Sequence, residues 1–167
     1  MVDVQYNTEL TELRATGLAI TEIDLSSNTK LTTVSLLNEY LTAITISSLP
    51  ELKGVVYIEK TDTQRGMVLS AAKTKTSWDG AKTWCSNYGS GWYLPSLDEL
   101  KVIYNNKDRI NFLLSKLGCT TLTDFYWSSN YDIYNSEFAS IFNFSSGGSQ
   151  GSIRKVGAYP VRAVLAF

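Results

Sequence analysis

Few residue types in this chain could do chemistry, and histidine is absent from all 167 positions. Without an imidazole the chain cannot build a Ser-His-Asp triad, a Cys-His nucleophile pair or a zinc site with histidine ligands. The two cysteines, Cys85 and Cys119, cannot complete a structural zinc site by themselves. They can pair as one disulfide, as thiols of exported domains do when geometry allows, or stay buried as small hydrophobic side chains. Both alternatives stay open at this level.

Acidic residues could act as general acids or bases, and we take as candidates Asp79, Asp98, Glu99, Asp124, Asp132 and Glu137. Their spacing does not indicate a pair of catalytic carboxylates. The Glu-Pro-Asn, Gln-Pro-Asp and Trp-Asn-Asp sequences that are typical of calcium-dependent sugar binding are missing as well. We therefore predict that the protein is not an enzyme and that it uses no metal and no cofactor.

Residues 130–160 are rich in Asn, Tyr, Ser, Gly and Phe. Tyr, Ser, Asn and Gly are also the types that paratopes favour, because tyrosine gives a large contact area at low entropy cost and the small polar residues adapt their hydrogen bonds. Surface loops favour Asn, Ser and Gly too, but exposed tyrosines without a purpose would be costly. The predicted ligand-binding residues are Asn130, Tyr131, Asp132, Tyr134, Asn135, Ser149, Gln150, Ser152, Arg154 and Tyr159. Their predicted partner is an unknown protein or glycan on a cell surface.

The elements that must position this insert begin with helices. Ser77–Cys85 is predicted as a helix, because Ser77 can cap it and apolar residues recur on one face. Ser96 with Glu99 three positions later forms a capping-box pattern that opens a second helix, and a third covers about 109–117. Short strands rich in Tyr, Phe, Ser and Val follow, and their expected members include Ala139, Ile141, Phe142 and Phe144. Helices followed by strands indicate an α+β fold.

The first sixty residues repeat with a period of 21 positions. Val2-Asp3-Val4 aligns with Ile23-Asp24-Leu25 and with Ile44-Thr45-Ile46, and leucines recur in step at other positions. This period indicates a short leucine-rich-repeat solenoid over residues 1–59, with about three repeats. The spacing resembles the short repeats of surface proteins from gut Bacteroidetes, and we interpret the segment as a spacer.

The repeat region begins and ends abruptly. Its first residues correspond to the middle of a repeat unit, so we expect native sequence upstream of Met1, where an export signal would lie. The visible N-terminus has no basic segment followed by an apolar core, which a signal peptide requires. The period stops in the polar stretch Thr61-Asp62-Thr63-Gln64, and residues 60–167 are predicted to form the second domain.

Four blocks of the second domain carry a resemblance to a known family. Trp-x-x-Ala-x-x-Trp-Cys-x-x-Tyr covers 78–88, and Gly-Trp-Tyr-Leu-Pro-Ser-Leu-Asp-Glu-Leu covers 91–100. Tyr-Trp-Ser-Ser follows at 126–129, and Val-Arg-Ala-Val-Leu-Ala-Phe closes the chain at 161–167. In this order the blocks resemble the DUF1566, or Lcl C-terminal, family of bacterial surface domains. The resemblance implies a C-type lectin-like fold.

The same resemblance implies roles for particular residues. Trp92, Leu94, Pro95 and Trp127 would be core and turn residues, and 161–164 would belong to the final central strand. Similar domains are the variable proteins of diversity-generating retroelements, whose substitutions fall just before a fixed Val-Arg-Ala-Val end. A diversified insert and an ordinary Asn-rich loop are both compatible with this sequence.

Charge and hydropathy argue against nucleic acid and a membrane as partners, although a small local patch could still bind either. The net charge of −1, without a long run of either sign, argues against nucleic acid. No apolar run approaches the roughly 18 residues that a membrane span needs. We therefore predict a non-catalytic ligand-binding or adhesion protein outside the cell, at a cell surface or at a virion surface. The alternative is a structural surface or scaffold domain without a dedicated ligand.

Overall fold

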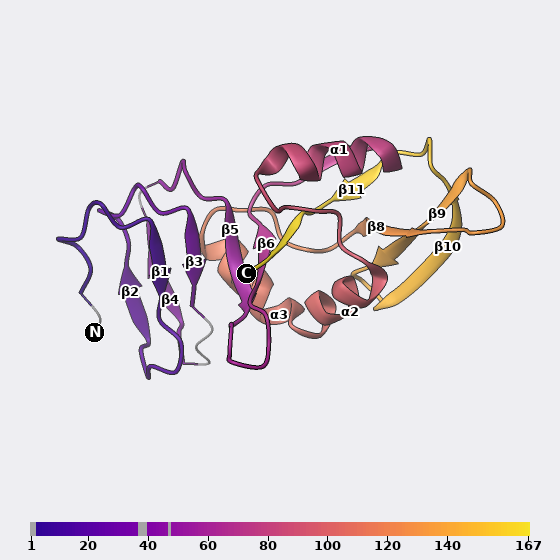
Figure 1. Ribbon diagram of the computed structural model, residues 1–167. Coiled ribbons are helices and arrows are strands. Elements are labelled where there is room, and N and C mark those ends of the chain that lie inside the picture. The colour runs from indigo at the N-terminus through magenta and orange to yellow at the C-terminus, as the bar shows by residue number, and fades with distance from the viewer. Residues whose placement is uncertain (1–2, 37–39, 47) are drawn as a thin grey trace. The chain divides into compact units, whose positions relative to one another are not determined.

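The structure is a computed structural model that describes residues 3–36, 40–46 and 48–167, so Val2 of the predicted repeat lies outside it. Strands in mixed sheets and three helices make an α+β fold, as the element order predicts (Figure 1). The chain divides into two compact units, Met1–Ala71 with Asp108–Thr121 and Ala72–Lys107 with Leu122–Phe167. None of the described helices is long and apolar enough to cross a membrane.

The first unit is built from short strands, most of which run parallel. Its elements are β1 (Glu12–Arg14), β2 (Glu22–Asp24), β3 (Thr33–Ser35), β4 (Ala43–Thr45), β5 (Gly54–Ile58), β6 (Met67–Ser70) and most of α3 (Lys107–Lys116). β1, β3 and β5 pair in parallel, and β2 pairs with β4 in the same way. β6 then pairs with β5 in the antiparallel direction. Two sets of parallel strands therefore alternate along the chain.

The strand register repeats with the chain. Glu12 pairs with Thr33, and Thr33 pairs with Gly54, so each partner lies 21 residues further on. Glu22 pairs with Ala43 at the same offset. Leu13, Val34 and Val55, which lie 21 residues apart in β1, β3 and β5, are buried, and so is Ile23 in β2. Residues 21 positions apart along the chain thus pair across these parallel strands.

A buried asparagine ties two of these segments together. The Nδ2 group of Asn28 donates to the backbone oxygen of Val4 at 3.0 Å and to that of Asn7 at 2.8 Å. Asn7 occupies the equivalent position one segment earlier, but its own side chain is exposed. Buried backbone oxygens accept hydrogen bonds in nearly all native structures. Asn28 supplies additional donors to both oxygens.

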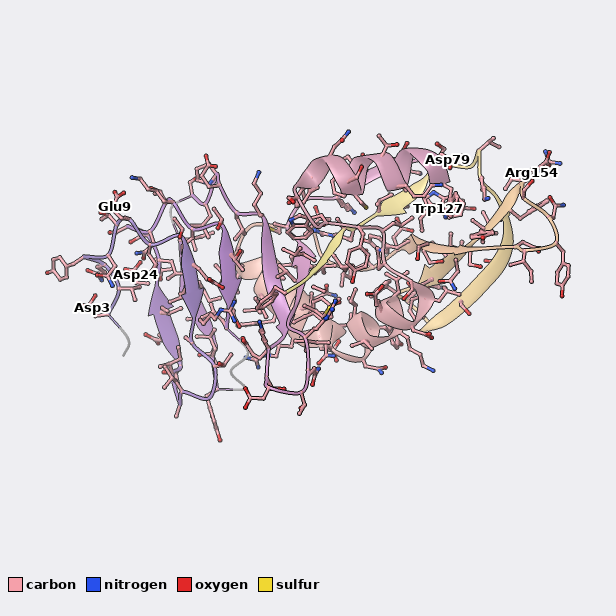
Figure 2. The ribbon with its side chains drawn as sticks, viewed as in Figure 1. Asp3, Glu9, Asp24, Asp79, Trp127 and Arg154 are labelled. Atoms are coloured by element: carbon pink, nitrogen blue, oxygen red, sulfur yellow. The ribbon has the colours of Figure 1, made fainter. Side chains whose placement is uncertain are left out.

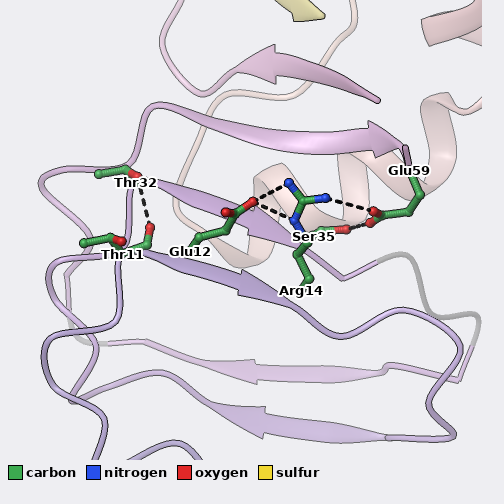
Figure 3. Close-up of polar contacts among 6 residues, drawn as sticks. All are labelled: Thr11, Glu12, Arg14, Thr32, Ser35 and Glu59. Atoms are coloured by element: carbon green, nitrogen blue, oxygen red, sulfur yellow. Dashed lines mark hydrogen bonds and ion pairs between the residues drawn. The ribbon is translucent and has the colours of Figure 1, made fainter. Parts of the chain in front are cut away.

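A row of polar side chains crosses the strands of the first unit (Figure 3). Arg14 Nη2 lies 2.6 Å from Glu12 Oε1, and Arg14 Nη1 lies 3.6 Å from Glu59 Oε2. The hydroxyl of Ser35 donates to the Glu59 carboxylate. Thr32 Oγ1 also donates to the backbone oxygen of Thr11, which lies 21 positions earlier. Partly exposed ion pairs of this kind contribute little stability each, so the row mainly fixes strand register.

The second unit combines two helices with three antiparallel sheet strands. Its elements are β7 (Thr74–Thr76), α1 (Trp78–Tyr88), α2 (Leu97–Asn105), β8 (Phe125–Tyr131), β9 (Phe138–Asn143), β10 (Gly148–Arg154), β11 (Tyr159–Val161) and β12 (Val164–Ala166). The sheet has the order β10-β9-β8, and β11 pairs with β7. Of the residues expected in strands, Ala139, Ile141 and Phe142 lie in β9 and Phe144 lies in the turn after it; all four are buried.

Two buried tryptophans fasten the first helix to the sheet. The indole N–H of Trp78, in α1, donates to the backbone oxygen of Ser128 in β8 at 2.7 Å. The indole N–H of Trp127, in β8, donates to the backbone oxygen of Thr76 in β7 at 2.9 Å. Each tryptophan therefore holds the backbone beside the other one. The predicted core residues Trp92, Leu94 and Pro95 are buried as well.

The predicted caps of the first two helices are confirmed, whereas α3 begins at Lys107, two residues before the predicted start. Ser77 caps α1 by accepting a hydrogen bond from the backbone N–H of Gly80, and Ser96 with Glu99 forms the complete capping box of α2.

Cys85 lies on the buried face of α1, where desolvation raises the pKa of its thiol to about 12. Cys119 is half-buried. Both cysteines are thiols, so they do not form the disulfide that the sequence left open.

The predicted final strand is wrong in one respect, because it is broken. β11 pairs with β7, whereas Val164 in β12 exchanges two backbone hydrogen bonds with Tyr93. Arg162 lies buried at this change of partner. Burial raises the pKa of the Tyr126 hydroxyl, and the nearby Arg162 guanidinium offsets part of that rise. A single alternating strand would have sent Arg162 to one face of a continuous ladder.

Replacing Asn28 should measure the coupling between segments. Asn28→Ala removes two buried hydrogen bonds, so the free energy of unfolding should fall by about 1–3 kcal/mol. Asn7→Ala is the matched control, because the same residue type one segment earlier is exposed, and it should change the free energy by less than about 0.5 kcal/mol. Urea unfolding curves provide the measurement. Equal losses for both variants would show that the Asn28 amide does not join the segments.

The Cys85 thiol should be inert in the folded protein. Because burial raises its pKa from 9.0 to about 12, almost no thiolate exists at mildly alkaline pH, and the thiolate is the nucleophile. Iodoacetamide should therefore label Cys85 only after addition of denaturant, as peptide mass spectrometry can measure. The half-buried Cys119 serves as the internal comparison. Labelling of native Cys85 at the rate of Cys119 or faster would contradict the assignment.

Candidate functional site

Two loops meet at one end of the sheet of the second unit. Residues 132–137 join β8 to β9, and residues 155–158 join β10 to β11. The backbone N–H of Lys155 donates to the backbone oxygen of Glu137 at 2.8 Å, and the backbone oxygen of Lys155 accepts from the backbone N–H of Trp78 at 2.9 Å. We call residues 131–137 and 154–158 the rim. The rim is thereby bonded to the first turn of α1.

The longer loop of the rim is shaped by its own side chains. Asp132 Oδ1 accepts from the backbone N–H of Tyr134 at 2.8 Å and from that of Asn135 at 3.2 Å. Asn135 Oδ1 accepts from the backbone N–H of Glu137 at 3.1 Å. Side chains that bond to their own backbone in this way mimic a turn. Asp132 and Asn135 were predicted as ligand-binding residues, and their side chains hold the loop instead of pointing away from it.

Aromatic rings and ammonium groups pack beneath the rim. Trp78 is buried, and the Tyr131 ring meets it edge-on with 6.0 Å between centroids. The Lys155 ammonium lies 4.2 Å from the Trp78 ring centroid and 5.1 Å from that of Tyr131. The Lys82 ammonium lies 3.8 Å from the Trp78 ring and 2.8 Å from Asp79 Oδ1. A cation and the face of an aromatic ring attract each other, so the Trp78 ring holds both lysine side chains in place.

A hollow of about 280 Å³ opens beside this cluster, and it is lined by Asp79, Ser136, Glu137, Arg154, Lys155 and Val156. Figure 2 shows Asp79 and Arg154 at the same end of the second unit. Both signs of charge border the hollow, together with one hydroxyl. Such a lining can exchange ion pairs and hydrogen bonds with a polar ligand.

Large apolar side chains stand out from the rim into solvent. Tyr134 is 93% exposed, Val156 is 83% exposed and Ile133 is 76% exposed. Most apolar residues of this size are buried, and grouped exceptions commonly mark a contact surface. Within the described residues, no group of three or more Cys, Asp or Glu side chains is arranged to hold a metal ion.

The predicted ligand residues fall into separate places. Tyr131, Asp132, Tyr134, Asn135 and Arg154 come together at the rim. Asn130 instead accepts a hydrogen bond from the backbone N–H of Leu97 at 2.8 Å, at the start of α2. Tyr159 pairs with Thr76, and its ring packs edge-on against Trp127 at 5.0 Å. Both of these residues support the frame.

The remaining predicted residues lie along β10, which pairs only with β9 in its sheet. Ser149 and Gln150 are exposed there, and the side chain of Ser152 lies outside the described part of the structure. At about 3.3 Å per strand residue, Ser149 lies at most roughly 17 Å from Arg154 along the strand. Sequence reasoning missed other rim residues, namely Ile133, Ser136, Glu137, Lys155 and Val156. The sequence does indicate a turn at Lys155 and Val156, because Gly157 follows them.

No protein-family model matches the chain, and no curated protein matches it. Its structure is similar to that of a fimbrial protein from Bacteroides ovatus ATCC 8483, with a TM-score of 0.48 and 17% sequence identity. This similarity covers 61% of the chain and 36% of the fimbrial protein, so the chain spans well under half of that protein's length. A second similar structure is the snake venom toxin convulxin, with a TM-score of 0.42 and 10% sequence identity. This similarity covers 67% of the chain and 95% of the convulxin chain. Likenesses this distant carry no residue's role from either protein to this chain, and the resemblance to the Lcl C-terminal family stays a prediction.

Proposed function

We propose that this chain is a non-catalytic ligand-binding or adhesion protein that contacts its partner through the rim. The observation that carries this proposal is the group of exposed apolar side chains Ile133, Tyr134 and Val156 on two loops that are hydrogen-bonded together. A few anchor residues, most often Trp, Tyr and Arg, supply most of the binding energy in protein interfaces. A charged hollow beside them gives orientation and specificity.

The fixed shape of the rim supports the proposal. Asp132 and Asn135 bond the backbone of the longer loop, and Lys155 joins the second loop both to the first loop and to α1. A loop that already holds its bound shape loses less entropy when it binds. Tyr134 is therefore displayed on a prepared support, which a loop without function would not need.

The nature of the partner follows from the mixed surface. Exposed apolar groups with both signs of charge nearby suit a protein, and a tyrosine beside hydrogen-bonding groups also suits a glycan. Neither histidine nor an accessible reactive thiol accompanies the acids of the hollow, so recognition fits better than catalysis. The partner is accordingly a protein or glycan at a cell surface.

The finer predictions belong to the same proposal. Residues 60–167 would form a C-type lectin-like domain of the Lcl C-terminal family, exported to a cell or virion surface. The parallel strands offset by 21 residues would be a leucine-rich solenoid that acts as a spacer. Residues 130–160 would be the segment that a diversity-generating retroelement varies. The register of the strands and the exposure of the rim support these proposals without testing them.

Removing the apolar anchors should abolish binding. The double variant Tyr134→Ala with Val156→Ser deletes two exposed side chains, so folding should change by less than about 0.5 kcal/mol while affinity falls at least tenfold. Glycan arrays and cell-attachment assays measure the binding, and thermal unfolding measures the fold. Tyr159 is left unchanged because its ring packs on Trp127.

The matched control is Tyr6→Ala, since Tyr6 is an equally exposed tyrosine, at 89%, in the first unit. It should bind like the parent. Undiminished binding by the double variant would place the site elsewhere. Absence of binding by the parent itself would favour the alternative of a structural surface domain without a ligand.

Comparison of several genomic copies tests the retroelement hypothesis separately. Diversification predicts substitutions confined to codons that contain adenine, concentrated at exposed positions such as Tyr134 and Gln150. Buried positions such as Phe142 and Trp127 should stay constant, because they form the frame. Substitutions spread evenly over both groups of positions and over all codon types would contradict diversification and leave an ordinary loop.

A further inference from the structure

A second surface of the same unit has a different chemistry. A shallow groove of about 400 Å³ runs between β7 and α1, and it is lined by Thr74, Thr76, Gly80, Thr83, Trp84 and Asn87. We call it the threonine groove. None of these residues belongs to the rim, and none of them carries a charge.

The helix supplies one complete face of the groove. Gly80, Thr83, Trp84 and Asn87 are spaced at i, i+3, i+4 and i+7, which places them on one side of α1. The buried residues Trp78, Ala81 and Cys85 point to the core from another side. The groove-lining residues are therefore additional to those that fold the helix onto the sheet.

The strand supplies the opposite wall. Thr74 and Thr76 share one face of β7 because side chains alternate along a strand, and Lys75 between them is exposed on the other face. A Cβ atom on Gly80 would lie 2.3 Å from Thr76 Oγ1, so only glycine allows the strand to approach the helix this closely. The Trp127 N–H holds the backbone of Thr76 in that position.

The polar groups of the groove are available to a ligand. Within the described part of the chain, the side chains of Thr74, Thr76 and Asn87 make no hydrogen bond to the protein. The Thr83 hydroxyl donates to the backbone oxygen of Asp79 at 3.1 Å, so the lone pairs of Thr83 Oγ1 can still accept a hydrogen bond. Hydroxyl and amide groups can both donate and accept hydrogen bonds. The groove thus presents matched donors and acceptors without a charge.

An aromatic ring completes the groove. Trp84 is half-buried, and Tyr88 packs beside it with 5.0 Å between ring centroids. Tyr88 in turn meets the buried Trp92 edge-on at 4.9 Å. This row of rings supports the indole of Trp84, so its position is set before any ligand arrives.

We propose that the threonine groove binds the ring of a neutral sugar. A pyranose ring has an apolar C–H face that packs on an indole and hydroxyl groups that pair with hydroxyls and amides. Charged ligands find no counter-charge in the lining, and a peptide side chain finds no aliphatic pocket there. The site is independent of the rim and does not rest on the function proposed for it.

Saturation-transfer NMR with the full chain tests this site directly. The probes are methyl glycosides of glucose, galactose, mannose and N-acetylglucosamine, with glucuronic acid and a tryptophan-free tripeptide as the charged and peptide alternatives. At least one neutral glycoside should bind, with its ring C–H protons receiving the strongest transfer. Trp84→Ala should weaken that binding by about tenfold or more, through loss of the stacked ring.

Three further variants make the outcome decisive. Lys75→Ala, on the other face of β7, should bind like the parent, and so should the rim variant Tyr134→Ala. Asn87→Ala changes an exposed side chain and should weaken binding even if Trp84→Ala fails to fold. The proposal is overturned if no neutral glycoside binds, if only the acid or the peptide binds, or if Asn87→Ala has no effect. Loss of binding in Tyr134→Ala would assign the sugar to the rim and overturn it too.

Discussion

The second unit depends on one reciprocal contact between two tryptophans. Trp78 in α1 donates its indole N–H to the backbone beside Trp127, and Trp127 in β8 donates to the backbone two residues before Trp78. Both side chains are buried, so water does not compete for these bonds. The contact joins β7, α1 and β8 at a single point. A shift of α1 would break the bond from Trp78, a shift of β7 the bond from Trp127, and a shift of β8 both.

Both surfaces of the unit are placed by this contact. The rim attaches to it through the backbone bond between Trp78 and Lys155, and the Lys155 ammonium rests over the Trp78 ring. The threonine groove attaches through Thr76, whose backbone oxygen accepts the Trp127 N–H. Because the tryptophan contact forms a rigid scaffold, the loops of the rim can display side chains without building a core of their own.

Local chemistry was predictable from the sequence, whereas the site was only partly so. The caps at Ser77 and Ser96 depend on side chains reaching a few residues along the chain, and they formed as expected. The roles of Asn130 and Tyr159 depend on partners 33 and 32 residues away, Leu97 in one case and Trp127 in the other. Composition cannot separate such frame residues from exposed ones of the same type. The break of the final strand at Arg162 was equally unpredictable, because a change of strand partner leaves no local signal in the sequence.

The two surfaces differ in charge because α1 divides its residues between them. Asp79 lines the charged hollow beside the rim and pairs with Lys82 three positions later, whereas Gly80 and Thr83, each one residue further on, line the uncharged groove. A rotation of 100° per residue is enough to separate the two sets. If both surfaces bind ligands as proposed, the charges at the rim would favour a charged ligand there and the uncharged lining of the groove a neutral one. One turn of α1 thus contributes to two linings of different charge.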